Sequence, residues 1–233
     1  MKNIEVVAKA DDLIEIKTVL VSCFDKKGLI SNDGMEEEFP KCGVLGMIAQ
    51  YCPNVKFIAT GKTFEVIKKA GMNVIDISEH TGYPEMKSGM VKTLHPLIHA
   101  GILGNKYTES DQEYMDDFHI QPIDAIIINF YGFSEAVDNN ESLEIIRQNI
   151  DIGGASLCHA ARKAFINTVL IANPSEYGKM IDNISQNAGC STMEYRLNAA
   201  KRASKHLTSL MLMIDKFFQE ITLSKVEEEY TML

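Results

Sequence analysis

The feature of this 233-residue sequence that most constrains its fold is a set of short apolar runs rich in β-branched residues. We predict that these runs are strands, at residues 18–24, 55–60, 73–78, 125–131 and 168–173. The runs are apolar throughout rather than alternating, which is typical of strands that are buried on both faces of a parallel sheet. The sequence therefore predicts an α/β fold, with a parallel sheet covered by helices on both faces.

Amphipathic segments alternate with these runs. Residues 63–70 are predicted to form a helix that is capped by Thr63 and stopped by Gly71. Residues 174–186 form another, which opens with proline in its first turn, and residues 156–165 form a third. This alternation of strand and helix supports the parallel arrangement.

The longest periodic segment covers residues 193–221, where apolar side chains recur every three or four positions. We expect a helical C-terminal segment that is broken near Thr208 and packs against the sheet or against a second subunit. The acidic tail, residues 226–233, is expected to be frayed. We predict that residues 1–233 form a single domain.

The charge balance narrows the classes of partner. Lys and Arg total 23 against 32 Asp and Glu, and this net charge of −9 disfavours a nucleic-acid partner. The longest apolar stretch, residues 125–131, is too short to span a bilayer, so we expect a cytoplasmic protein that does not associate with membranes. The sequence has no Gly-x-Gly-x-x-Gly, Walker A or Gly-x-Ser-x-Gly motif, which disfavours the common nucleotide-binding and hydrolase classes.

Glycine, hydroxyl and lysine residues are concentrated in segments at or just after the ends of predicted strands, at residues 22–28, 60–63, 81–96 and 149–156. In any one of these loops the glycine could merely turn the chain and the lysine could be solvated. Parallel strands, however, bring such loops together at one edge of the sheet, where backbone N–H groups and lysines can bind an anion. Four loops together favour an anionic ligand.

Longer motifs in these loops carry a family resemblance. The sequence reads Thr-Gly-Tyr-Pro-Glu-Met at 81–86, Val-Lys-Thr-Leu-His-Pro at 91–96 and Asn-Ile-Asp-Ile-Gly-Gly at 149–154. With Asn129, Tyr131 and Lys163, this pattern closely resembles the IMP cyclohydrolase domain of the bifunctional AICAR transformylase/IMP cyclohydrolase family, over residues 18–220.

The resemblance implies a Rossmann-like, methylglyoxal-synthase-like sheet and a homodimer. The implied reaction closes the second purine ring: 5-formamidoimidazole-4-carboxamide ribotide becomes IMP and water, with no metal and no organic cofactor. The implied partner is thus a purine ribonucleotide substrate. The chain ends where the cyclohydrolase half of the family ends, so we expect no transformylase domain here and a separate transformylase beside it.

The catalytic residues that the resemblance implies are Lys92, Tyr131, Asp151 and Lys163. The substrate- and phosphate-binding residues that we expect are Ser22, Lys26, Thr60, Gly61, Lys62, Thr63, Thr93, Asn129, Ile152 and Gly153. In ring closure a carboxamide nitrogen attacks the formamide carbon, so a proton leaves nitrogen while negative charge grows on oxygen. Lys92 would stabilise that charge, Asp151 paired with Lys163 would deprotonate the amide, and Tyr131 would donate to the departing hydroxyl.

Several positions depart from the family pattern. Met90 stands where the family has an arginine and Phe24 where it has a serine, while Lys62 adds a positive charge in place of a glycine. An insertion of about fourteen residues before Gly43 is long enough to act as a flap over the ligand.

These departures keep alternative functions open. The chain could be a related cyclising or dehydrating enzyme that acts on another ribotide, or a non-catalytic purine-nucleotide sensor. His95 and His99 are four residues apart, a spacing that also suits a metal. No third ligand is evident, so we interpret them as structural or substrate-side histidines.

Overall fold

A computed structural model describes residues 7–86 and 90–232, except for the side chain of Tyr131. Its main sheet is parallel and five-stranded, in the order β4-β3-β2-β5-β6. The strands are β2 (Thr18–Ser22), β3 (Lys56–Ala59), β4 (Val74–Asp76), β5 (Ala125–Ile128) and β6 (Val169–Ile171). All five predicted strands and the α/β class are confirmed.

The helices are α1 (Gly43–Tyr51), α2 (Gly61–Lys69), α3 (Ile77–Thr81), α4 (Pro96–Leu103), α5 (Glu109–Asp117), α6 (Tyr131–Asp138), α7 (Leu143–Gln148), α8 (Ile152–Lys163), α9 (Tyr177–Gln186), α10 (Met193–Glu220) and α11 (Leu223–Glu229). A short 3₁₀ turn, Pro174–Glu176, leads into α9, as the proline at 174 predicts.

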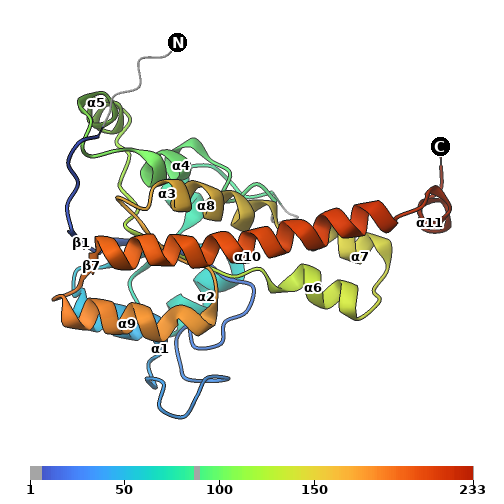
Figure 1. Ribbon diagram of the computed structural model, residues 1–233, viewed down its shortest axis with the longest axis horizontal. Helices are drawn as coiled ribbons and strands as arrows, with labels where there is room; N and C mark the ends of the chain where they lie inside the picture. Colours follow the sequence, from blue (N-terminus) through green and yellow to red (C-terminus); the bar gives the residue numbers. More distant parts are fainter. Residues whose placement is uncertain (1–6, 87–89, 233) are drawn as a thin grey trace.

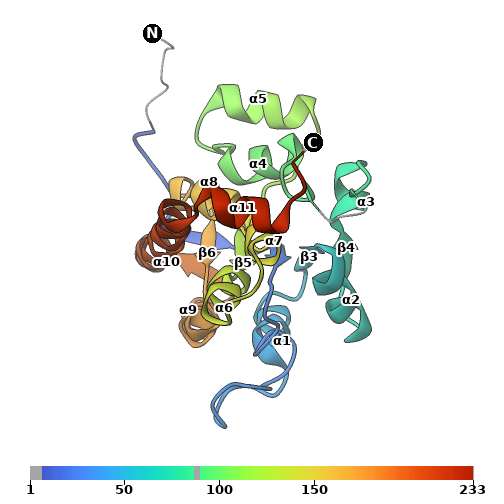
Figure 2. The ribbon, with the colours of Figure 1, turned by 90° about the vertical axis from the view of Figure 1, so that its right-hand side faces the viewer.

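Side chains of each strand alternate between two apolar layers. Val19 and Val21 of β2 belong to the cluster under α1 and α9, whereas Leu20 belongs to the cluster under α4, α8 and α10. Figures 1 and 2 show α1 and α9 on one face of the sheet and α4 and α8 on the other, with α10 along the β6 edge, where its side chains enter both clusters. Burial on both faces explains why the strands carry no polar alternation.

Helix boundaries differ from the sequence expectations at two places. α2 begins at Gly61, and Thr60 rather than Thr63 is the flanking residue. α8 begins at Ile152, four residues before the predicted start, because the side chain of Asp151 caps its first turn.

The predicted break in the C-terminal helix near Thr208 is wrong. α10 runs 28 residues without interruption, and Thr208 lies on its exposed side between the buried Leu207 and Leu210. The expectation of a frayed tail is wrong for residues 226–229, which form the second half of α11. Its Glu229 accepts hydrogen bonds from the backbone N–H groups of Leu143 (2.6 Å) and Glu144 (3.2 Å) at the start of α7.

A second, antiparallel pair of strands joins the segment before β2 to the segment before α10, and the sequence did not predict it. β1 (Leu13–Glu15) pairs with β7 (Cys190–Thr192). Beside the pair, the fully buried Arg196 donates to carbonyl oxygens of residues 11, 12, 165 and 191 at 2.6–3.2 Å. This arginine fastens the N-terminal segment to α10.

The second half of α10 projects from the body together with α6, α7 and α11 (Figure 1). Phe133, Ala136, Ile146 and Leu210 form a small core of their own within this arm. The insertion before α1 packs elsewhere: its Met35 and Phe39 contact the main core, and the Phe39 ring lies 6.5 Å from that of Tyr177 in α9. In the described part of the chain, no helix has both the length and the apolar character that crossing a membrane requires.

Candidate active site

The loops that follow β2, β3 and β5 meet at the carboxyl edge of the sheet. Asn129, buried just after β5, organises the first of them: its carboxamide oxygen accepts the N–H groups of Phe24 (2.8 Å) and Asp25 (3.0 Å). Its amide nitrogen donates to the Asp25 carbonyl at 2.7 Å. Asn129 was predicted to contact the substrate, but most of its hydrogen-bonding groups hold the first loop in position.

Hydroxyl groups join the ends of β2 and β3. The hydroxyls of Ser22 and Thr60 lie 3.2 Å apart, and the buried Thr63 donates to the Cys23 carbonyl at 3.1 Å. Thr60 precedes α2 but its side chain does not cap the helix. The first turn of α2 can therefore offer N–H groups, and the positive end of the helix dipole, to an anion.

Lys92 reaches this helix end from the loop before α4. Its ammonium nitrogen lies 2.7 Å from the point where a Cβ on Gly61 would stand, so a side chain at residue 61 would displace it. Val91, directly before it, has a φ of 69°, which costs a β-branched residue about 1–3 kcal/mol. The nitrogen also lies 3.4 Å from a carboxylate oxygen of Glu85, whose other oxygen is buried with no hydrogen-bond partner among the described residues.

Two further lysines lie at the same edge. Lys26 donates to the carbonyl oxygens of Cys23 (2.9 Å) and Phe24 (2.7 Å) in its own loop. Burial lowers the pKa of Lys26, and the positive charges of Lys62 and Lys92 lower it further. The predicted convergence of lysines is thus present, in a protein with a net charge of −9.

The N-terminus of α8 forms the next part of the edge. Asp151 accepts the N–H of Gly154 at 2.6 Å, and burial raises the pKa of this carboxyl, although the Gly154 hydrogen bond opposes the shift. The hydroxyl of the buried Thr93 lies 2.7 Å from where a Cβ on Gly153 would stand, so residue 153 must be small. Ile152 is exposed beside them.

The predicted pairing of Asp151 with Lys163 within one chain is wrong. Asp151 precedes the first residue of α8 and the exposed Lys163 is the last of its 12 residues. A helix of that length separates them by about 18 Å. Arg162, directly before Lys163, hydrogen bonds to His159 (2.6 Å) and to the Ser204 hydroxyl on α10 (3.1 Å).

Two positions that depart from the family pattern lie at the surface of the site region. The Phe24 side chain is 57% exposed, and its ring edge lies 3.4 Å from where a Cβ on Gly132 would stand, at the start of α6. Met90 is 52% exposed. Tyr131 begins α6, but its side chain lies outside the described residues.

The two histidines do not share a helical face. His95 precedes α4, and its Nδ1 accepts the N–H of Leu97 at 3.2 Å, whereas His99 lies within the helix. Among the described residues, no three His, Cys, Asp or Glu side chains are grouped so that they could hold a metal ion. Glu85 is the residue that sequence reasoning missed. Its only signal was its place in the motif at 81–86.

Comparison with known proteins agrees with this architecture. Residues 50–156 match the model of the MGS-like domain family. The bifunctional purine biosynthesis protein PurH of Bartonella henselae is 34% identical over 207 residues, which cover 89% of this chain and 36% of that protein. Its counterpart from Magnetococcus marinus is 35% identical over 178 residues, 76% of this chain and 31% of that protein. The chain thus spans about a third of the length of these curated relatives.

Among solved structures, the crystal structure of ForH aligns with a TM-score of 0.71, covering 87% of this chain and 97% of that chain. At 22% identity this likeness concerns the fold alone. The family resemblance predicted from the motifs at 81–96 and 149–154 is confirmed by the curated relatives. The chain therefore has an MGS-like fold and is a homologue of the PurH proteins of purine biosynthesis.

Proposed function

We propose that this chain is a cyclohydrolase that converts 5-formamidoimidazole-4-carboxamide ribotide to IMP and water. The observation that carries the proposal is the position of Lys92, whose ammonium group lies against Gly61 at the N-terminus of α2. A cation and a helix N-terminus that meet at one point favour an anionic ligand. The relatives' role in purine biosynthesis supports a ribonucleotide as that ligand.

The phosphate end of the ribotide would bind at α2. Backbone N–H groups of its first turn and the hydroxyls of Ser22 and Thr60 offer hydrogen bonds to phosphate oxygens. Lys26 and Lys62 supply positive charge nearby. This set accounts for the affinity of the site but performs no chemistry.

The reacting end would lie between Lys92 and α8. Asp151 is suited to take the proton from the carboxamide nitrogen, because its raised pKa makes it a stronger base than an ordinary aspartate. Lys92 would stabilise the negative charge that grows on the formyl oxygen. Tyr131 is assigned the donation to the departing hydroxyl, whereas Lys163 has no part in this scheme within one chain. The scheme uses no metal and no organic cofactor.

Turnover of the purified protein tests the proposal. The protein is incubated with the formamido ribotide and IMP is followed by chromatography. We expect IMP to form above the uncatalysed rate, Lys92→Ala to abolish the gain, and Lys69→Ala, at the far end of α2, to retain it. Absence of turnover would refute the cyclohydrolase, and tight IMP binding without turnover would favour the sensor.

A second candidate is a cyclising enzyme that acts on a different ribotide. The exposed Phe24 ring beside Gly132 favours this second candidate, because an aromatic ring at this position would change the surface that the base of the ribotide contacts. A panel of imidazole and pyrazole ribotides distinguishes the two candidates. If only the formamido ribotide reacts, this second function is excluded.

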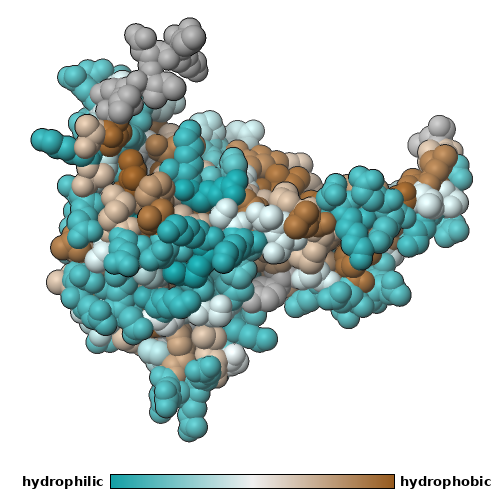
Figure 3. All heavy atoms as spheres, viewed as in Figure 1, coloured by the Kyte–Doolittle hydropathy of each residue, from teal (hydrophilic) through white to brown (hydrophobic). Residues whose placement is uncertain are grey.

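We also propose that the protein works as a homodimer and depends on a separate transformylase for its substrate. Exposed apolar side chains on the second half of α10 support the dimer: Leu212 is 64% exposed and Phe218 57%. Figure 3 shows apolar side chains along this arm, interspersed with hydrophilic ones. Sedimentation velocity of the wild type and of Leu212→Glu tests the dimer, which the substitution should weaken.

A further inference from the structure

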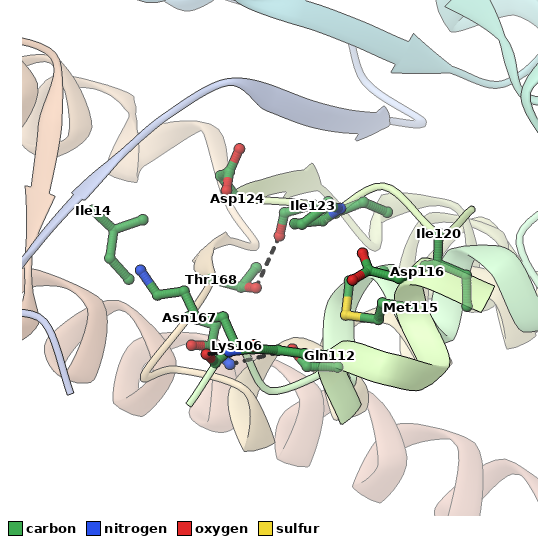
Figure 4. Close-up of a pocket in the computed structure, with 13 residues that line it drawn as sticks. Ile14, Lys106, Gln112, Met115, Asp116, Ile120, Ile123, Asp124, Asn167 and Thr168 are labelled. Carbon is green, nitrogen blue, oxygen red and sulfur yellow. Dashed lines mark hydrogen bonds between the residues drawn. The ribbon is translucent and has the colours of Figure 1, made fainter. Parts of the chain in front are cut away.

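A cavity of about 280 Å³ lies at the opposite edge of the sheet from the candidate active site. Asp124 lines it directly before β5, whereas Asn129 of the site directly follows that strand. Five residues of extended chain place the two about 16 Å apart. The cavity is thus a separate place in the fold, bordered by β1, α4, α5 and the segments that enter β5 and β6 (Figure 4).

Much of the cavity wall is apolar. Ile14 comes from β1, Met115 from α5, and Ile120 and Ile123 from the segment before β5; all four side chains are buried. The cavity opens to solvent on one side, and about 280 Å³ is room enough for an aromatic ring and a substituent, since about 150 Å³ holds benzene.

The charges around the cavity favour a hydrogen-bond donor. Asp124 and Asp116 both line it, and among the described residues the Asp124 carboxylate accepts hydrogen bonds from backbone N–H groups. Lys106 is the cation of the lining, but its ammonium group pairs with Asp11 at 2.7 Å. The carboxylates therefore outnumber the cations, and a positively charged ligand group would be attracted.

We propose that this cavity binds a small, largely apolar molecule that carries an amine or amidine group. Its ring or chain lies against the isoleucines and Met115, and its N–H groups lie towards Asp116 and Asp124. This ligand class is opposite in charge to the ribotide proposed for the active site. The two sites are therefore distinct in chemistry as well as in position.

Benzamidine is a suitable probe, because it combines an aromatic ring with a cationic N–H donor. We would titrate it into ¹⁵N-labelled protein and follow the backbone amide signals. We expect saturable shifts at Met115, Ile123 and Thr168, weaker binding of the neutral isostere benzamide, and no binding of benzoate at these signals. Saturating IMP should not displace benzamidine, which separates this test from that of the cyclohydrolase.

Two neighbouring aspartates on α5 provide matched variants. Asp116 lines the cavity and Asp117 does not, although both are exposed and both substitutions remove one charge. Asp116→Asn should weaken benzamidine binding about two- to fivefold, the range typical of one surface ion pair, and Asp117→Asn should leave it unchanged. Equal effects of the two aspartate variants, equal binding of benzoate, or no shift at the cavity signals would overturn the proposal.

Discussion

A carboxylate oxygen of Glu85 and the ammonium nitrogen of Lys92 lie 3.4 Å apart, with both side chains about three-quarters buried. The Lys92 ammonium group thus has two neighbours: the Glu85 carboxylate and the N-terminus of α2 at Gly61. An anionic ligand that approaches Lys92 must therefore compete with Glu85. The pair sets how strongly the site attracts a phosphate or an oxyanion.

Replacing this carboxylate by its neutral amide should strengthen anion binding. We expect Glu85→Gln to lower the Kd for IMP about fivefold, or about 1 kcal/mol, because one repulsive charge is removed. Calorimetric titration of IMP measures it. Glu135→Gln, a substitution on α6 outside the Lys92 contact, is the control. A Kd that rises or stays constant in Glu85→Gln would contradict the competition.

The close approach of Lys92 to Gly61 predicts a functional cost for any side chain there. Gly61→Ala places a methyl group 2.7 Å from the ammonium nitrogen and strains a φ of +41°. Because the lysine end is flexible, it moves aside, so turnover should fall at least tenfold while stability falls by about 1 kcal/mol. In Gly178→Ala, where nothing lies within 4 Å of the new methyl group, turnover and stability should both be preserved. Equal turnover of the two variants would exclude a requirement for this approach.

Asp151 combines two duties that substitutions can separate. Asparagine caps a helix as well as aspartate does, but it cannot accept a proton. Asp151→Asn should therefore abolish turnover with little loss of Tm, whereas Asp151→Ala should also lose about 1 kcal/mol of stability. Thermal unfolding and IMP formation measure the two effects. Retained turnover in Asp151→Asn would remove it from the mechanism.

The raised pKa of Asp151 fixes the sign of its pH dependence. Burial makes the folded carboxyl hold its proton above the ordinary value of 3.8. The ionised form is the base, so turnover should fall as pH drops through that raised pKa. The free energy of unfolding changes in the opposite direction. Because the folded state binds the proton more tightly than the unfolded state, the ionised Asp151 destabilises the fold at neutral pH, and this destabilisation disappears as pH falls. A pH profile with no acid limb above the ordinary carboxyl pKa of 3.8 would contradict this role.

Lys62 adds a charge that the family pattern lacks, near the proposed phosphate. Because its side chain is exposed, we expect Lys62→Gly to weaken IMP binding by about 1 kcal/mol. The corresponding nucleoside, which lacks the phosphate, should bind equally poorly to both proteins. Lys69→Gly, on the last turn of the same helix, is the matched control. Indistinguishable dissociation constants would show that Lys62 is outside the site.

Arg196 should be among the most sensitive positions for stability. Arg196→Met leaves the carbonyl oxygens it contacts without donors, and should cost about 3 kcal/mol. Arg147→Met, which breaks an exposed pair with Glu144 on α7, should change the free energy of unfolding far less, because solvent screens the pair. Urea unfolding of both variants measures the difference.

The sequence predicted the strands well because their signal is local: a run such as residues 125–128 is apolar whichever way the chain folds. The start of α8 was missed because two glycines disfavour a helix there, while the Asp151 cap decides its boundary. The pairing of Asp151 with Lys163 came from the family resemblance, which carries over residue identities but no distances within this chain. Arg196 could not be predicted as buried, because some of its partners lie more than 180 residues away and arginine is usually a surface residue.

The β1–β7 pair has a consequence for how the protein is made. Ile14 and Ser191 pair across 177 residues, so β1 leaves the ribosome well before its partner strand is synthesised. At translation rates of about 5–20 residues per second, β1 waits roughly 10–35 s unpaired. The parallel sheet can assemble during that interval, since its last strand, β6, precedes β7. Arg196 can fasten the N-terminal segment only after β7 has been made, so nascent chains stalled before residue 190 should leave that segment open to proteases.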